Sequence, residues 1–456
     1  MKFKPNQARG AARTFPPRAQ AVAFMMNSEE RSGPSRRVRL ASQAALARAG
    51  GYVLRFHRIL SAFAASLIAL APFQAYAQVG EESVSVRDRP RPEFDPLGTR
   101  VGAFELDARL DLGVTSTDNL FAEPSGFEDD DIIYSVSPWA RLASGWSRHY
   151  LSVEGGARFT SHEDFSSEDA ETYFVRSVGR LDVGSSTSIT GAVGFAHEVE
   201  PRTDPDAPLT PEPVEFDRND MSVSVSHTFN RFRVTAEAAR GEQDFDGLQD
   251  FRDNEETVLR GRVEAELTPR IGLVFQASAD ERDYDNSPAN NSEGQTYLAG
   301  VTIGFTDLMQ GEFTVGQFDR DYEGFGSTDG LAVAAELEWY ITRLTTITLN
   351  ARRNAEDVIG GFTALPYVEQ EYGARVDHEL LRNLILTGSV QTGTREYEVV
   401  DRDDEFFNGE IGADYLMNRR VAIEARYRHE EVESSGIDAY RDFEVNAVTV
   451  GLSLRL

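Results

Sequence analysis

Long runs of the chain alternate apolar and polar side chains. In the run at 103–115, Phe104 and Leu106 alternate with Glu105 and Asp107, and the same order continues to the end of the run. Successive side chains of a β-strand point to opposite faces, so this pattern gives a strand one apolar and one charged face. The alternation therefore predicts a β-strand here.

The same pattern recurs along the rest of the chain and predicts about 18 strands. The expected strands are 103–115, 132–144, 148–160, 170–183, 187–199, 216–229, 231–243, 254–267, 270–284, 293–305, 309–322, 328–341, 344–356, 366–380, 383–398, 405–417, 419–432 and 441–456. They are longer than the strands of soluble sheets, which usually have about five or six residues. Their length suits a tilted strand that crosses a bilayer, which needs about 9–11 residues.

The connections between these strands alternate in length. Tight turns such as 230–231 and 342–343 alternate with longer, acidic links such as 116–131 and 200–214. Short turns at one end and long loops at the other are typical of outer-membrane barrels, with the short turns in the periplasm. We expect both termini on the periplasmic side and the proline-rich stretch 201–213 to be a stiff extracellular excursion.

The physics of lipid explains why such strands must close into a ring. In a bilayer every backbone N–H and C=O needs a partner within the protein, and an open sheet edge would leave one row unpaired. A β-propeller would pack four strands into about 40 residues, and stacked sandwiches would need shorter strands. The sequence thus predicts an all-β, transmembrane, antiparallel up-and-down β-barrel of about 18 strands.

The N-terminal part of the chain predicts a targeting segment and not a part of the folded barrel. Residues 55–77 have a basic start, a short apolar stretch and a small-residue site that predicts cleavage between Ala77 and Gln78. This is the pattern of a secretory signal peptide, and the apolar stretch is too short for a membrane-spanning helix. We expect a signal peptide at 53–77, and before it, at 1–52, a disordered basic extension or a misassigned start. A periplasmic segment at 78–101 and the barrel at 102–456 follow.

Composition narrows the possible partners. The net charge is −29 and there is no cysteine, which excludes disulfides, cysteine metal sites and thiol nucleophiles. The acidic excess lies in the body, since the lysines and many arginines precede residue 78. Nucleic acid is therefore not an expected partner, because phosphate binding needs clustered positive charge.

Several short motifs carry a family resemblance. They are Arg91-Pro92-Glu93-Phe94-Asp95-Pro96-Leu97-Gly98-Thr99-Arg100-Val101-Gly102-Ala103-Phe104, Asp118-Asn119-Leu120-Phe121-Ala122, Asp129-Asp130-Asp131, Pro138 and Ser144-Gly145-Trp146-Ser147-Arg148-His149. From about residue 91 onward the chain resembles the putative β-barrel porin 2 family of bacterial outer-membrane proteins. The resemblance implies a porin-like barrel in a Gram-negative outer membrane. Some members are linked to secretion of exopolysaccharide or capsule.

The polar face of the strands supplies candidate pore-lining residues. These candidates are Glu105, Arg109, Arg141, Arg158, Arg180, Arg260, Arg262, Glu264, Glu336, Glu338, Arg375, Arg426 and Arg428. Charged side chains around a lumen hydrate the passage and set its ion selectivity. They could equally pair with one another and stiffen the wall, and both interpretations stay open at this point. An 18-stranded barrel has room for an aqueous lumen.

Other chemistry finds little support in the sequence. The acidic loops lack the spaced, glycine-kinked pattern of a calcium loop, and the histidines lack metal-ligand spacing. No nucleophile elbow or phosphate loop is present. We predict neither cofactor nor metal nor enzymatic activity. The aromatic residues near strand ends are expected to mark the membrane interfaces. They are Trp139, Trp146, Tyr150, Trp339 and Tyr340.

The leading hypothesis is a porin-like conduit for export of exopolysaccharide or capsule polymer, the polymer being implied by the resemblance alone. Its partners would be outer-membrane lipid, an anionic or neutral polysaccharide and periplasmic export components. The resemblance also implies insertion by the barrel-assembly machinery, although the chain ends in Leu456 where such barrels usually end in an aromatic residue. The alternatives are a general diffusion porin for small hydrophilic solutes, a structural or adhesive barrel, and a membrane hydrolase.

Overall fold

The computed structural model describes residues 84–456, except 206, 209, 307, 361–362 and 437–440. The predicted extension at 1–52, the signal peptide at 53–77 and the cleavage site at Ala77 and Gln78 lie outside the described residues. Within the described residues, no helix has the length and apolarity needed to cross a bilayer.

Most of the described chain is β-strand, as the alternation predicts. The strands are β1 (Thr99–Val101), β2 (Phe104–Thr117), β3 (Asp131–Ser144), β4 (Tyr150–His162), β5 (Ala170–Val183), β6 (Thr187–Val199), β7 (Glu215–Phe229), β8 (Phe232–Phe245), β9 (Asn254–Thr268), β10 (Ile271–Tyr284), β11 (Ser292–Thr306), β12 (Met309–Tyr322), β13 (Gly326–Thr342), β14 (Thr345–Gly360), β15 (Thr363–Leu381), β16 (Leu384–Tyr397), β17 (Arg402–Asn418), β18 (Val421–Gly436) and β19 (Phe443–Arg455). Every long strand expected from the sequence is confirmed. The sequence missed β1, which is too short to show a pattern.

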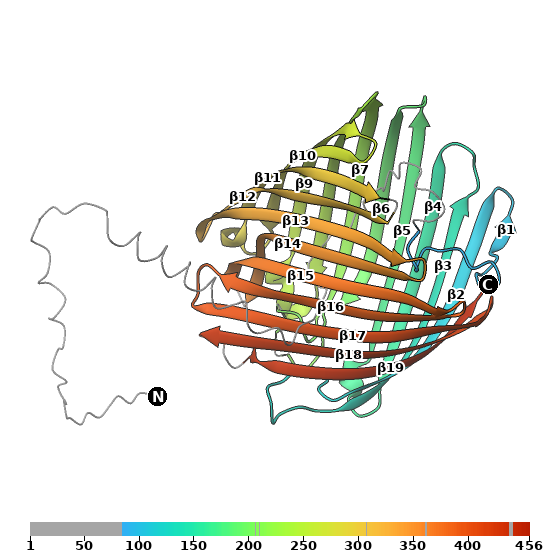
Figure 1. Cartoon of the computed structure of the whole chain (residues 1–456). Helices are drawn as coiled ribbons and strands as arrows, with labels where there is room; N and C mark the ends of the chain where they lie inside the picture. The colour runs from blue at the N-terminus through green and yellow to red at the C-terminus, as the bar shows by residue number, and fades with distance from the viewer. Residues whose placement is uncertain (1–83, 206, 209, 307, 361–362, 437–440) are drawn as a thin grey trace, which may run out of the picture. The chain divides into compact units, whose positions relative to one another are not determined.

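The strands β2 to β19 close into an antiparallel barrel (Figure 1). Each strand pairs with the next one along the chain, and β19 returns to pair with β2. At this seam Val450 lies opposite Val114 and Leu452 opposite Leu112. The short strand β1 pairs with the first residues of β2. Closure gives every strand of the wall a paired neighbour on both sides, as a lipid environment requires.

The two ends of the barrel differ in their connections. At one end, which we call the short-turn end, the strands are joined by turns such as 230–231, 343–344 and 419–420. Asn230 takes a left-handed backbone conformation there, with φ 52°, as two-residue hairpin turns require. At the other end, the long-loop end, lie connections such as 118–130 and 200–214, which confirms the expected alternation.

Burial in this barrel is the reverse of burial in a soluble protein. Apolar side chains of the outward face are exposed, for example Leu331 at 53% and Val450 at 54%. Among inward-facing residues, Thr346 and Asp377 are only 3% exposed. A continuous apolar exterior suits contact with hydrocarbon, and a polar interior suits water.

Candidate functional site in the lumen

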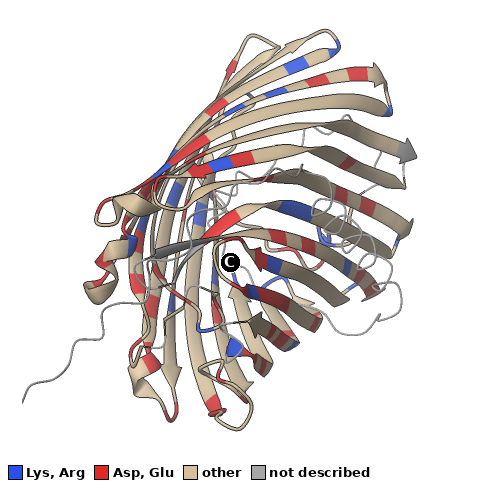
Figure 2. Cartoon of the chain, turned by 90° about the vertical axis from the view of Figure 1, so that its left-hand side faces the viewer, with Lys and Arg blue, Asp and Glu red and all other residues tan. Residues whose placement is uncertain are grey.

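The strand register places the predicted pore-lining residues on one face of the wall. Arg260 lies opposite Glu237, and Glu336 lies opposite Glu312. The pairing of each strand with the next places the other predicted residues on the same face. They are Glu105, Arg109, Arg141, Arg158, Arg180, Arg262, Glu264, Glu338, Arg375, Arg426 and Arg428. Figure 2 shows acidic and basic positions recurring along the strands. That these residues line a conducting path stays a prediction.

Many of the inward charges pair with one another. Arg262 Nη2 lies 2.6 Å from Glu312 on β12, and its Nε lies 2.8 Å from Glu264. Arg260 Nη1 is 3.2 Å from Glu237, and Arg109 Nε is 3.1 Å from Asp111. The Arg260–Glu237 pair joins neighbouring strands and the Arg262–Glu312 pair joins β9 to β12, whereas the other two pairs lie within one strand. All four leave less free charge in the passage. The stiffening interpretation therefore accounts for a large part of the inward charge.

Arg158 on β4 is different. Its side chain is exposed, and in the described part of the chain no carboxylate lies within ion-pairing distance of it. Arg141 on the adjacent β3 donates a hydrogen bond to the Tyr150 hydroxyl rather than to an acid. A free guanidinium on the inner face presents its whole positive charge to a passing solute.

Three of the aromatic residues expected at the membrane interface lie on the inner face instead. Trp139 lies opposite Arg109 and stacks against it, with the guanidinium 4.7 Å from the ring centre. Tyr150 bonds Arg141, and Tyr340 donates to Glu338 at 2.6 Å. The prediction of an interface position is wrong for these three, because the alternation of side chains along each strand places them on the inner face. Trp339 does face outward, at 39% exposed.

The hairpin of β14 and β15 leaves the wall and folds into the lumen. Among the described residues the β13–β14 ladder ends at Val333 and Arg353, whereas β14 and β15 stay paired to Gly360 and Thr363. We call residues 354–368, of which 361–362 are not described, the inward hairpin. The sequence predicts a connection at 357–365, which is wrong because both strands continue.

A buried polar cluster anchors the inward hairpin to β10. The Asp357 carboxylate, 1% exposed, accepts hydrogen bonds from Arg282 Nη1 at 2.5 Å and from the Tyr284 hydroxyl at 3.0 Å. Arg282 also reaches Glu256 on β9 at 3.1 Å. Since β11, β12 and β13 lie between β10 and β14 in the wall, the hairpin spans their inner face. It therefore narrows the lumen toward the long-loop end.

Apolar packing supports the same arrangement. Phe318 on β12, Ala332 on β13 and Val368 on the inward hairpin form a buried cluster. Phe318 and Ala332 occupy inward positions, which are polar along most of the wall. An apolar side chain at such a position gains from burial only if another segment covers it. The hairpin supplies that cover.

The loop 200–214 also folds over the lumen instead of extending away as expected. Glu200 pairs with Arg252 in a fully buried bridge, at 3.0 Å from its Nη1, and Arg202 Nη2 lies 2.7 Å from Glu168. On the far side, Arg441 between β18 and β19 donates to the Ala207 carbonyl at 2.9 Å. These bridges hold the loop across the long-loop end.

The comparison with known protein families agrees with the sequence motifs and with the barrel geometry. A family model described as putative beta-barrel porin 2 matches residues 91–456.

The chain belongs to this family.

It is an outer-membrane β-barrel with a porin fold, as the sequence predicted. No curated protein matches the chain.

Several solved structures are similar to this family member at low sequence identity. OpdL of Pseudomonas aeruginosa is 14% identical, with 78% of this chain and 100% of that chain covered and a TM-score of 0.43. OccK2 (OpdF) of the same organism, solved in complex with glucuronate, is 13% identical, with 77% and 98% covered and a TM-score of 0.45. OccAB2 of Acinetobacter baumannii is 12% identical, with 78% and 99% covered and a TM-score of 0.46. At this distance the likeness says nothing of the solute.

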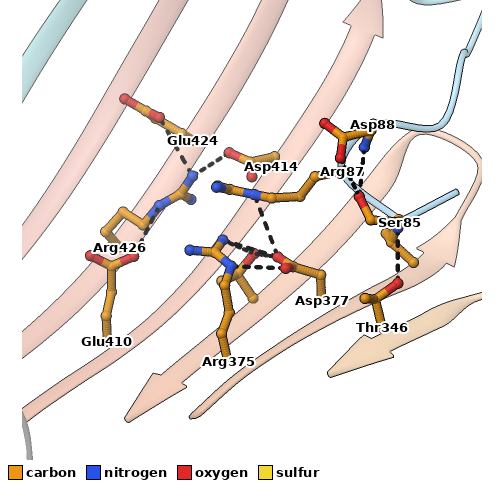
Figure 3. A network of polar contacts seen from close by, with 12 residues as sticks. Ser85, Arg87, Asp88, Thr346, Arg375, Asp377, Glu410, Asp414, Glu424 and Arg426 are labelled. Carbon is orange, nitrogen blue, oxygen red and sulfur yellow. Dashed lines mark hydrogen bonds and ion pairs between the residues drawn. The ribbon is translucent and has the colours of Figure 1, made fainter. Parts of the chain in front are cut away.

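The porin wall carries an acidic patch near its short-turn end. Arg426 on β18 lies between Glu410 and Glu424, each at 3.7 Å, and bonds Asp414 (Figure 3). Nearby, Arg375 Nε pairs with Asp377 on β15 at 2.8 Å. Carboxylates outnumber arginines within the wall here, so the patch favours additional positive charge.

The segment 84–98 supplies that charge. Arg87 reaches Asp377 at 3.6 Å, and the Val86 backbone N–H donates to Thr346 Oγ1 at 3.0 Å (Figure 3). Asp377 and Thr346 lie directly opposite each other on the inner face of β14 and β15. The sequence placed 78–101 in the periplasm but gave no sign that its described part contacts the inner wall.

Proposed function

We propose that this barrel is a porin-like conduit for small hydrophilic solutes. The inner face is polar and charged along its length, whereas the outer face is apolar, so water and solutes are favoured inside and lipid outside. The paired inward charges and the free Arg158 are compatible with a hydrated path. Thirteen residues named from the sequence as pore lining are part of this proposal.

The inward hairpin is the observation that carries the proposal. It is fixed in the lumen by the Asp357–Arg282 contact and by the cluster around Phe318, both buried. A rigid constriction of this kind admits small molecules and opposes the passage of a hydrated polymer chain. The lumen thus gives no support to exopolysaccharide export, and it favours the alternative of a diffusion porin. Insertion by the barrel-assembly machinery stays a proposal based on family membership.

The experiment is flux through the purified, folded protein. Proteoliposomes would be tested for swelling in neutral sugars of increasing size, and planar bilayers for single-channel current. We expect flux of mono- and disaccharides that falls steeply with size and vanishes for long dextrans. Passage of dextrans as fast as of disaccharides would favour polymer export, and the absence of both flux and current would favour a structural barrel.

A further inference from the structure

The segment 84–98, which we call the strap, lies against the inner face at the short-turn end. Val86 is completely buried there, with its N–H bonded to Thr346 Oγ1. The strap forms no strand before β1, and a local turn shapes its start, where Ser85 Oγ donates to Asp88 at 2.7 Å. Its attachment to the wall therefore depends largely on side chains.

Three alternating arginines attach the strap to β15. Arg87 pairs with Asp377, whereas Arg89 and Arg91 both pair with Glu379, at 3.4 and 3.1 Å. The last of these pairs is buried, with side chains 4% and 5% exposed, while Arg87 is 54% exposed. Buried pairs lose far more than exposed ones when one partner is removed. Arg91 and Glu379 are thus the strongest point of attachment.

Beyond Arg91 the strap follows the rim of the barrel. Arginines from successive short turns donate to its carbonyl groups: Arg382 to Pro90 at 3.0 Å and Arg419 to Pro92 at 2.6 Å. Arg455 at the end of β19 donates to Phe94 at 3.4 Å. Both turn arginines make these bonds in exposed positions, where water and salt compete with them.

We propose that the strap is a releasable constriction of the periplasmic mouth, with the Arg91–Glu379 pair as its latch. Its displacement breaks side-chain contacts and bonds to single carbonyls, but no ladder of the barrel wall. The wall therefore stays closed while the mouth widens. The inference rests on the proposed conduit, and the test below separates the failure of one from the failure of the other.

The test uses single-channel recording of the full-length barrel in planar bilayers. Glu379→Gln removes the negative charge of the latch, and Arg91→Gln removes its positive charge. The matched control is Asp217→Asn, which removes a carboxylate from the outer face of β7, on a part of the wall that the strap does not contact. We expect both latch variants to raise conductance about twofold through the wider mouth, and the control to leave it near the wild-type value.

A reversible lock keeps the test decisive if a latch variant folds poorly. The chain has no cysteine, so Val86→Cys with Thr346→Cys introduces a single possible disulfide. Oxidation should hold the channel in its low-conductance state without large openings, and reduction of the same folded molecules should restore the openings. Equal conductance in the oxidised, reduced, latch-variant and wild-type proteins would overturn the strap. Absence of current in every folded protein would instead overturn the conduit.

Discussion

The wall from β10 to β16 and the wall from β4 to β6 are built by the same alternation, yet they differ in what lies against them. The first holds the inward hairpin through Asp357 and the strap through Glu379. The second keeps Arg158 exposed on its inner face. Alternation therefore specifies the wall, whereas the segments that depart from alternation determine the passage through it.

The largest expected effect comes from detaching the inward hairpin. Asp357→Asn breaks a buried ion pair, which costs about 3 kcal/mol or more because Arg282 loses its closest acid. We expect higher conductance and passage of larger sugars in the swelling assay. Asp217→Asn, on the outer face of β7, is the control, and a D357N channel with wild-type size cutoff would contradict the role of the hairpin.

The loop 200–214, which follows β6, can be detached in a similar way. Glu200→Gln leaves the Arg252 guanidinium buried without its carboxylate, so the loop 200–214 should detach at its base. Trypsin added to intact cells should then cleave after Arg202 several-fold faster than in the wild type. Unchanged cleavage would mean that the remaining contacts, such as Arg202 with Glu168, suffice to hold the loop.

The wall from β4 to β6 can be tested through the unpaired charge of Arg158. Arg158→Gln should shift the reversal potential in a salt gradient toward cation selectivity, with a permeability ratio changed by about twofold or less. Arg260→Gln removes the same charge from a residue paired with Glu237. If Arg158 faces the passage without a paired acid, the Arg158 variant changes the ion selectivity and leaves the melting temperature unchanged. The Arg260 variant also lowers the melting temperature, because it breaks the pair with Glu237.

The smallest effect concerns the long-loop end. Burial, together with the nearby Asp244, Asp250 and Asp285, raises the pKa of Asp253. A raised carboxyl pKa in the folded state means that stability falls as pH rises from the ordinary aspartate range through the raised value. Asp253→Asn, whose amide oxygen can still accept from the Phe245 N–H, should flatten this part of the stability profile. Melting temperatures measured across that pH range would check it.

The sequence was sufficient to predict the strands of the wall, because each strand shows a local alternation of apolar and polar residues. Period-two alternation needs no knowledge of distant contacts, and parity placed residues such as Arg262 and Glu264 on the inner face. Parity alone could not show that Arg262 also reaches Glu312, which lies two strands beyond its own neighbour.

The sequence did not predict the inward hairpin or the strap, because both depend on contacts between residues far apart in sequence. Nothing near Asp357 indicates that Arg282 will meet it, and nothing near Arg91 indicates Glu379. One signal was available: Phe318 interrupts a polar series of inward positions on β12, between Gly316 and Arg320. An apolar residue at such a position indicates that some other segment covers it.

The seam between β2 and β19 has a consequence for biogenesis. Thr117 must meet Ala447, so the ring is completed by partners from opposite ends of the folded chain. Such distant pairing carries a large entropy of loop closure and is slow. Until it occurs, two strands expose unsatisfied hydrogen-bonding edges that can recruit other chains. The nascent protein is therefore most vulnerable to aggregation just before its final registration, when a chaperone or membrane catalyst has most to contribute.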